Sequence, residues 1–401
     1  MIIVTLYLTL GQQIFVAGLN FYSIRILMLF SWLRLVIRGE IKQIKFNRID
    51  ALVLLWVLSS VTIYTLLRQT TVAFIYKMGF AFDAIGLYFL FRCLIRDMDD
   101  IIILVKSMAI LCIPLSIMMG YEYITGNNVF SYFGGVPEFS EVREGRVRAQ
   151  GPFQHPILAG TFGATAAPLF AALWWQPRAK LLSVISFISA TCVFITSSSS
   201  GPLMAYVAGI LGLLLWPYRS RMRVLRWGLV IAIIGLEIVM KAPFYYIIDR
   251  ISSIVGGSGW YRSYLIEQAI RHFDDWWFLG TTDTASWMPF YITGRDQFAD
   301  ITNQYVAEGV NGGLLTLILF VSIIVYCCKY VGSLLKSNEG QTKQKVLMIW
   351  AIGVTLASHL VSFLSVSYYD QIVVLWYFIV AIIASLKNFE AAEKNLITNT
   401  K

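Results

Sequence analysis

Long apolar runs separated by short polar connections dominate the pattern of hydrophobic and polar positions along the chain. A run of roughly 15–22 apolar residues is long enough to cross a hydrocarbon layer as a helix. Such runs lie at about 2–19, 22–37, 49–67, 72–91, 101–119, 156–175, 181–197, 202–216, 227–240, 305–327, 346–367 and 371–386. The pattern therefore predicts an all-α polytopic membrane protein with about twelve transmembrane helices. The first run lacks a basic leader and a small-residue cleavage site, so we expect a retained span.

Two polar stretches divide the chain into three predicted regions. Residues 1–240 hold nine spans and a loop at about 120–155, residues 241–304 form one large loop, and residues 305–401 hold three spans and a tail. Within the large loop, helical spacing over Ser258–Phe273 predicts a short helix, on which Glu267 and Arg271 are four residues apart and form a surface ion pair.

The composition agrees with a membrane protein and excludes several functional classes. Hydrophobic residues make up 58% of the chain and charged residues only 14%, and the mean hydropathy is +0.68. The net charge of +9 is dispersed between apolar runs, which is not typical of nucleic-acid binding. The five cysteines lie within or beside apolar runs, so neither a disulfide framework nor a zinc site is expected.

Lysine and arginine fall mainly on alternate connections between the predicted spans. The positive-inside rule places these connections, and with twelve spans both termini, in the cytoplasm. The loops Tyr121–Gln150 and Lys241–Gln304 then face the outside. The positive residues of the cytoplasmic side are Arg34, Arg38, Lys42, Lys45, Arg48, Arg92, Arg96, Arg178, Lys180, Arg219, Arg221, Arg223, Arg226, Lys329, Lys336, Lys343 and Lys345.

Arginine is strongly preferred over lysine on the predicted outer side, where Lys241 is the one lysine. Guanidinium groups bind phosphate and carboxylate in a bidentate manner, which an ammonium group cannot do. The preference therefore favours an anionic ligand outside. The outer arginines are Arg68, Arg143, Arg146, Arg148, Arg250, Arg262, Arg271 and Arg295.

A hydroxyl-rich segment, Thr196–Pro202, lies between two spans at their outer ends. It predicts a tight turn whose hydroxyls cap the next helix. Tryptophans and tyrosines of the large loop fit either an interfacial aromatic belt or stacking against sugar rings. His155, beside Pro156, is interpreted either as a buried, hydrogen-bonded histidine or as a catalytic base.

Several short motifs, taken in order, resemble one family. They are Arg148 followed by Gly151-Pro-Phe-x-His155-Pro156, the turn before Gly201, Arg250, Arg262 followed by Trp277-Phe-Leu-Gly280, and Asn303-Gln-Tyr-x-x-Glu308-Gly309-x-x-Gly312. From about residue 120 to 325 the chain resembles the O-antigen ligase/polymerase superfamily. Its members are bacterial inner-membrane glycosyltransferases of the GT-C type.

The resemblance implies a glycosyltransferase without metal or cofactor that uses a glycan linked to undecaprenyl diphosphate at the periplasmic face. A departing diphosphate gains negative charge, which guanidinium groups stabilise. The candidate diphosphate-binding residues are Arg148, Arg250 and Arg262. The candidate bases for the acceptor hydroxyl are Glu308, Asp300 and His272. Further candidate binding residues are His155, Asn303 and Tyr305.

Two activities are compatible with the resemblance. In the ligases a histidine typically stands where this chain has Thr302, and a Ser-Arg-Gly pattern is common where it has Ser199-Ser200-Gly201. We therefore expect a polymerase that joins lipid-linked repeat units of O-antigen or another surface polysaccharide. The alternative is a ligase that transfers the glycan to lipid A core or a protein acceptor. The implied partners are the lipid-linked donor, a glycan or lipid acceptor, membrane lipids and a chain-length regulator, with no nucleic acid.

A transporter of lipid or glycan is the rival hypothesis from another class. Ionisable groups within apolar runs are costly and tend to face a cavity or a partner. The working groups of a transporter would be Asp83, Lys77 and Glu237. The internal pseudo-repeats typical of transporters are not visible in the hydropathy pattern.

Overall fold

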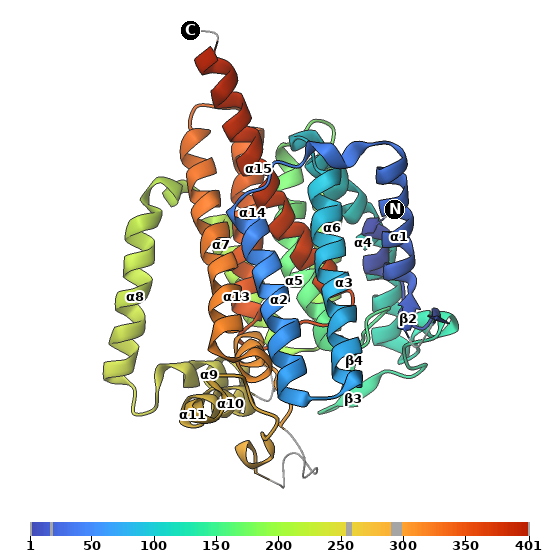
Figure 1. Ribbon diagram of the computed structural model, residues 1–401, viewed down its shortest axis with the longest axis vertical. Coiled ribbons are helices and arrows are strands. Elements are labelled where there is room, and N and C mark those ends of the chain that lie inside the picture. The colour runs from blue at the N-terminus through green and yellow to red at the C-terminus, as the bar shows by residue number, and fades with distance from the viewer. Residues whose placement is uncertain (1, 17–18, 254–258, 290–298, 400–401) are drawn as a thin grey trace.

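The computed structural model describes residues 2–16, 19–253, 259–289 and 299–399, and most of this part of the chain is helical. The longer helices stand side by side in one bundle (Figure 1). The α-helices are α1 (Ser23–Ile37), α2 (Arg48–Arg68), α3 (Thr71–Leu94), α4 (Met98–Thr125), α5 (Pro156–Ala172), α6 (Lys180–Thr196), α7 (Ser200–Leu214), α8 (Met222–Val239), α9 (Ile247–Ser253), α10 (Gly259–Arg271), α11 (Phe273–Trp276), α13 (Gln304–Ser337), α14 (Lys343–Ser362) and α15 (Ile372–Asn399). The structure is thus nearly all-α, as the sequence predicts.

Two short antiparallel hairpins are the strand elements of the described residues. They are β1 (Gln13–Val16) with β2 (Leu19–Tyr22), and β3 (Glu141–Arg143) with β4 (Arg146–Arg148). Short 3₁₀ helices connect several elements: η1 (Ile2–Tyr7), η2 (Glu40–Gln43), η3 (Val129–Phe133), η4 (Leu173–Trp175), η5 (Trp216–Arg221), η6 (Phe244–Tyr246) and η7 (Ala285–Trp287).

The apolar helices of the described residues are those of a multi-pass membrane protein. Seven of them are long and apolar enough to cross a membrane, namely α2, α3, α4, α5 with η4, α13, α14 and the first part of α15. The number rises to nine if each of two bent helix pairs, Ser200–Leu214 with Trp216–Leu225 and Trp227–Val239 with Phe244–Ser252, counts as one span. This is fewer than the twelve expected from hydropathy.

The span predicted at 2–19 is not a continuous helix. Its first part is η1, which packs between α1 and α4, with Tyr7 Oη donating to the Met108 carbonyl at 2.6 Å. The chain then turns at Gly11, where a Cβ atom would lie 2.2 Å from the backbone of Gly134, and continues into the β1–β2 hairpin. Close packing of two glycine backbones therefore overrides the apolar pattern here. Helices occupy the other eleven predicted ranges.

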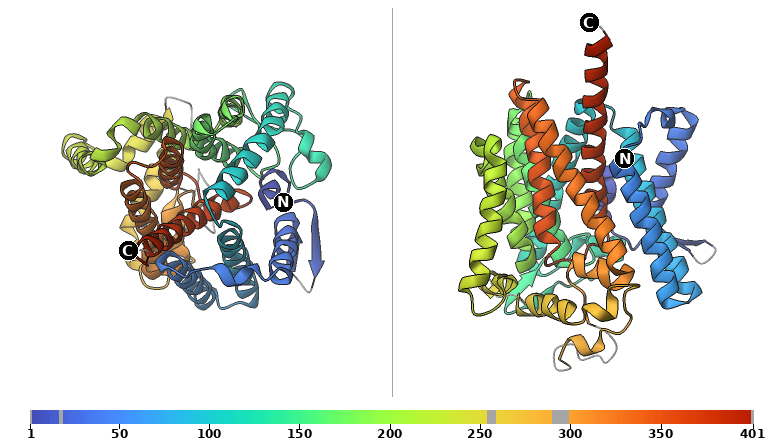
Figure 2. Two further views of the ribbon diagram at one scale, coloured as in Figure 1. Left: turned by 90° about the horizontal axis from the view of Figure 1, so that it is seen from above. Right: turned by 60° about the vertical axis from the view of Figure 1, so that its left-hand side comes forward.

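The two long polar loops lie at the same end of the bundle. The β3–β4 hairpin and helices α9, α10 and α11 cluster there, whereas the C-terminus lies at the opposite end (Figure 1). Helix α10 confirms the helix predicted over Ser258–Phe273 from Gly259 to Arg271, and Ser258 lies outside the described residues. Helix α8 stands at the edge of the bundle, on the opposite side from α1 (Figure 2), and none of its described side chains is fully buried.

Helix α5 forms the centre of the bundle and begins at the loop end. Nearly all of its side chains are buried, and it packs against α6, α7 and α14. Pro156 occupies its first turn, where a missing N–H costs nothing, and His155 caps it through Nδ1, which accepts from the Ile157 N–H at 3.1 Å. The start of α5 is therefore fixed beside the loops.

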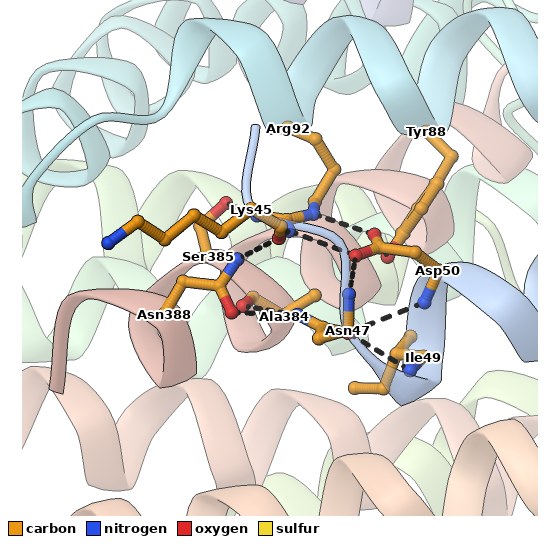
Figure 3. Close-up of polar contacts among 9 residues, drawn as sticks. All are labelled: Lys45, Asn47, Ile49, Asp50, Tyr88, Arg92, Ala384, Ser385 and Asn388. Carbon is orange, nitrogen blue, oxygen red and sulfur yellow. Dashed lines mark hydrogen bonds and ion pairs between the residues drawn. The ribbon is translucent and has the colours of Figure 1, made fainter. Parts of the chain in front are cut away.

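A buried ionic network locks α2, α3 and α15 together near the beginning of α2 (Figure 3). Asp50 accepts from Arg92 Nε at 2.8 Å and from Tyr88 Oη at 2.7 Å, and Arg92 Nη1 donates to Ser385 Oγ at 2.8 Å. Asn47 and Asp50 also form a reciprocal capping box that starts α2. Because the Arg92 and Asp50 side chains are only 3% and 0% exposed, the pair is shielded from water.

Candidate active site

Arg148 is held at the end of the β3–β4 hairpin and points into the protein. In this hairpin Glu141 is paired directly with Arg148, and its Oε2 accepts from Arg148 Nη1 at 2.7 Å. Arg148 Nη2 donates to Ser199 Oγ at 3.0 Å. The arginine is 6% exposed, whereas the Glu141 side chain is 51% exposed. One carboxylate at the protein surface therefore faces a buried guanidinium.

Arg262 reaches the same place from the large loop. It lies on the buried face of α10, and its Nη1 donates to Ser200 Oγ at 3.1 Å. The residue is 6% exposed and forms no ion pair with any residue that the structure describes. Helix α10 is fixed in turn by Ser263 Oγ, which donates to the Tyr245 carbonyl at 3.2 Å.

The hydroxyl-rich turn brings the two arginines together. Ser199 and Ser200 are consecutive residues, so two guanidinium groups from two different loops bind neighbouring hydroxyls. The predicted turn is present, but the predicted helix cap is wrong, because Ser199 at the N-cap of α7 forms no capping hydrogen bond. Its hydroxyl accepts from Arg148 and donates to the Ser197 carbonyl at 2.9 Å.

Gly201 lies close to Arg262 and to the connection between α14 and α15. A Cβ atom at this position would lie 3.4 Å from Arg262 Nη2 and 3.2 Å from both Ser365 Oγ and Ile157 Cδ1. Ser365 Oγ in turn donates to the Gly201 carbonyl at 3.3 Å. The connection between α14 and α15 thus borders the arginine site.

The charge at this site is not balanced. Burial, followed by the positive charges of Arg143 and Arg148, lowers the pKa of Arg262 to about 10, and burial is also the main cause that lowers the pKa of Arg148. The Nε atoms of Arg148 and Arg262 are buried and have no acceptor among the described residues. Unsatisfied buried donors and excess positive charge both favour binding of an anion.

His155 lies at the border of the arginine site as a neutral donor. Burial and then the charge of Arg148 lower the pKa of His155, so the ring is neutral at pH 7. Since its Nδ1 accepts from Ile157, the neutral ring carries its proton on Nε2. The half-buried histidine thus combines helix capping with an N–H donor. This arrangement agrees with a hydrogen-bonded histidine and not with a catalytic base, because Nδ1 is engaged and Nε2 carries the proton.

A cavity of about 510 Å³ is lined in part by the α14–α15 connection, through Phe363, Tyr368 and Tyr369. It is lined by residues from β2, α1, α3, α13 and α15, and by Gln154, which immediately precedes His155. Asp370 also lines it, with Oδ2 accepting from the Gln154 N–H at 2.8 Å. His359 Nδ1 and Tyr368 Oη, 2.7 Å apart, fix the connection to α14.

The three predicted bases lie in different surroundings. Glu308 is 8% exposed, and its two oxygens accept from Trp56 Nε1 at 2.9 Å and Gln304 Nε2 at 2.8 Å. Asp300 is exposed, and its carbonyl accepts from Tyr261 Oη at 2.8 Å. His272 stacks on Trp287 and pairs through Nδ1 with Asp275 at 2.9 Å. None of these contacts joins a predicted base to the arginine pair.

The remaining predicted binding residues have other neighbours. Asn303 caps α13 and donates to the Leu364 carbonyl at 3.0 Å, and Tyr305 Oη donates to the Leu360 carbonyl at 3.2 Å. Both therefore tie α13 to the end of α14. Arg250 is exposed on α9, in contrast to the buried Arg148 and Arg262. Arg295 lies outside the described residues.

The ionisable residues of the transporter hypothesis all have local partners. Asp83 accepts from Tyr22 Oη at 2.6 Å and from Arg25 Nε at 2.7 Å. Lys77 donates to Ser60 Oγ at 2.9 Å. Glu237, on the peripheral helix α8, accepts from the Phe244 N–H at 2.8 Å.

Sequence reasoning missed three features of this site. It assigned the serines to a turn and a helix cap, and it gave no role to Glu141 or Asp370. A polar cluster, Ser365-Val-Ser-Tyr-Tyr-Asp-Gln371, interrupts the last two apolar runs and is the signal that could have revealed Asp370. In the part of the chain that the structure describes, no three His, Cys, Asp or Glu side chains are grouped so that they could bind a metal ion.

Comparison with known proteins does not assign the chain to a family. No protein-family model matches it, and no curated protein is significantly similar to it. The function therefore has to be argued from the site itself.

Proposed function

We propose that this protein is a glycosyltransferase of the bacterial inner membrane that acts on a glycan linked to undecaprenyl diphosphate at the periplasmic face. Its preferred reaction is the polymerisation of repeat units of O-antigen or another surface polysaccharide. The single observation that carries the proposal is the pair Arg148 and Arg262, two buried guanidinium groups on the adjacent hydroxyls of Ser199 and Ser200.

A diphosphate suits this pair in charge and in shape. It offers several anionic oxygens, and guanidinium groups bind such oxygens with two parallel hydrogen bonds each. Among the described residues, Glu141 is the carboxylate that contacts the pair; it is half exposed and can swing into water when the diphosphate arrives. Arg148 and Arg262 would then hold a leaving group whose negative charge grows as the glycosidic bond breaks. His155 would add a neutral N–H donor beside them.

The proposed location follows from the arrangement of charge along the bundle. The arginine site lies at the end where the β3–β4 hairpin and α9–α11 cluster (Figure 1), and lysine is nearly absent from these loops. The connections at the other end mix lysine and arginine, which is typical of the cytoplasmic side. We therefore orient the arginine site toward the periplasm. A lipid carrier would present its diphosphate there at headgroup height.

The preference for a polymerase over a ligase rests on Thr302. In the family that the chain resembles, the ligases typically have a histidine at this position. Thr302 Oγ1 is buried and has no hydrogen-bond partner among the described residues. A threonine hydroxyl is a poor base at neutral pH, so it does not replace a histidine as an acceptor of the proton.

Analysis of lipid-linked glycans in a strain that lacks this protein tests the proposal. A polymerase predicts that single repeat units accumulate on undecaprenyl diphosphate and that long chains disappear. Long chains that accumulate on undecaprenyl diphosphate, with none on the final acceptor, would identify a ligase instead. Unchanged lipid-linked glycans and unchanged surface polysaccharide would overturn the proposal.

A further inference from the structure

The cavity at the α14–α15 connection has the lining of a sugar-binding site. Aromatic side chains form much of its wall, and amide groups of Asn20, Gln154 and Gln304 lie among them. Its volume of about 510 Å³ falls in the range of small-molecule sites. Aromatic faces bind the apolar faces of sugar rings, and amides and carboxylates bind their hydroxyls. The aromatic lining includes Trp56, Tyr76, Phe80, Tyr368, Tyr369 and Trp376.

The charges in this cavity favour a neutral ligand. Its charged lining residues are Arg25, Asp83 and Asp370. Arg25 and Asp83 neutralise each other through two hydrogen bonds of 2.7 Å, from Arg25 Nε to Oδ1 and from Nη2 to Oδ2. Tyr22 Oη donates to the same carboxylate at 2.6 Å. The lining thus has no excess positive charge, in contrast to the arginine site, and an anion would gain little there.

Asp370 supplies an unused acceptor in this cavity. Its Oδ2 is occupied by the Gln154 N–H, but its Oδ1 is buried and has no donor among the described residues. A buried carboxylate oxygen without a donor is costly, so a hydroxyl that donates to it would be bound favourably. Asp370 also has a left-handed backbone conformation with φ of 62°, which is uncommon for residues other than glycine and is found at functional sites.

One connection, between α14 and α15, reaches both the arginine site and the cavity. Ser365 contacts Gly201 beside Arg262, and Asp370 is five residues farther along the same connection. Five residues span at most about 17 Å when fully extended. Gln371 Nε2 ties the end of this connection to the Pro152 carbonyl at 2.8 Å, four residues beyond Arg148. A donor held by its diphosphate could therefore extend its first sugar toward Asp370.

We propose that this cavity binds a neutral sugar of the acceptor glycan and that Asp370 is the general base that accepts the proton of the acceptor hydroxyl. This inference rests on the proposed function. In the step, the hydroxyl oxygen attacks the anomeric carbon of the donor sugar and forms the new glycosidic bond. The bond from that carbon to the diphosphate oxygen breaks, and its electron pair leaves with the diphosphate at Arg148 and Arg262. The hydroxyl proton moves to Asp370 Oδ1.

The protonation of Asp370 suits this role. Burial raises the pKa of this carboxyl to about 7, and the backbone N–H groups of Gln154 and Gln371 oppose that rise. The titratable and charged groups near it are Tyr22, Tyr369, Asp300, Arg25 and Asp83. Burial raises the pKa of Tyr369 to about 12 and raises that of Tyr22, so both are neutral near pH 7. Transfer should therefore increase as the pH rises through about 7 and the carboxyl loses its proton.

The test measures transfer and two kinds of binding with the full-length protein in lipid bilayers. The donor is the lipid-linked glycan extracted from the deletion strain. The binding probes are inorganic pyrophosphate for the arginine site and the free glycan, released from the same lipid, for the cavity. Asp370→Asn should slow transfer by roughly 10²- to 10⁴-fold and remove the rise near pH 7, while pyrophosphate binding changes less than about twofold. Asp99→Asn, at an exposed position in the first turn of α4, is the matched control and should behave as the unmodified protein.

A second variant tests the cavity without changing Asp370. Ile75 lines the cavity from α3 and is 40% exposed, so Ile75→Trp should fill part of it and weaken binding of the free glycan by about tenfold or more while pyrophosphate binding persists. Near-normal transfer with an unchanged pH profile in Asp370→Asn, or unchanged glycan binding in Ile75→Trp, would overturn the inference. If instead the unmodified protein does not bind pyrophosphate and does not transfer glycan, the proposed function fails. Binding of the free glycan then decides by itself whether the cavity is a sugar site.

Discussion

Arg148 and Arg262 come from two different loops and donate hydrogen bonds to two consecutive serines, Ser199 at 3.0 Å and Ser200 at 3.1 Å. Each arginine is 6% exposed, and each keeps a buried Nε without an acceptor among the described residues. A buried donor without a partner costs about 1–3 kcal/mol. An anion that satisfies both groups would recover this free energy, and a diphosphate carries enough oxygens to bind both.

The orientation of the bundle can be decided by labelling single cysteines in a cysteine-free background. We expect an impermeant maleimide added from outside to label a cysteine at Ser286, in the large loop, but not one at Ser337, at the far end of α13. Both positions are exposed, so a difference reports the side of the membrane and not burial. The reverse pattern would place the arginine site in the cytoplasm and contradict a periplasmic reaction.

Glu141 should compete with the diphosphate for Arg148. Glu141→Gln removes the competing charge, and because a half-exposed ion pair is worth at most about 1 kcal/mol, we expect pyrophosphate to bind about two- to fivefold more tightly. Isothermal titration of the purified protein measures this change. Glu144→Gln, on the exposed turn of the same hairpin, is the control. Weaker binding in Glu141→Gln would mean that this carboxylate positions Arg148 for the ligand.

The buried pair of Asp50 and Arg92 should dominate stability near the start of α2. Asp50→Asn leaves the Arg92 guanidinium buried without its counter-charge, which costs about 3–5 kcal/mol. Thermal unfolding in detergent should show a large loss of stability. Arg96→Gln is the comparison, because the Arg96 side chain, paired with Glu40, is 46% exposed and such pairs contribute about 0–1 kcal/mol. Equal losses of stability in the two variants would show that burial of the Asp50–Arg92 pair does not increase its contribution to stability.

The sequence was sufficient to predict most helices because apolar runs of the required length leave little choice of structure. It failed at residues 2–19, where contact between Gly11 and the loop at Gly134 decides the backbone path. Contacts of this kind depend on residues far apart in the chain, which hydropathy does not report.

The sequence predicted only part of the candidate site, because the other part also depends on contacts between residues far apart in the chain. Arg148 and Arg262 stood out because arginine replaces lysine in the outer loops, and the structure brings both to one turn. Glu308 was predicted as a candidate base. Its burial and its hydrogen bonds to Trp56 and Gln304 depend on packing between α2 and α13, which the sequence does not report. The environment of Asp370 is likewise set by Gln154, more than two hundred positions earlier in the chain.

The most direct test of the account is glycan transfer by purified protein in lipid bilayers, with arginine replaced by lysine. Lysine keeps the charge but loses the paired N–H groups. Charge-assisted hydrogen bonds are worth about 1.5–3 kcal/mol each, so Arg148→Lys and Arg262→Lys should each slow transfer by roughly ten- to a hundredfold or more. Arg271→Lys should be nearly silent, because Arg271 is 67% exposed and pairs with Glu267 on the surface of α10. Transfer at the full rate in all three variants would contradict a diphosphate site at Arg148 and Arg262.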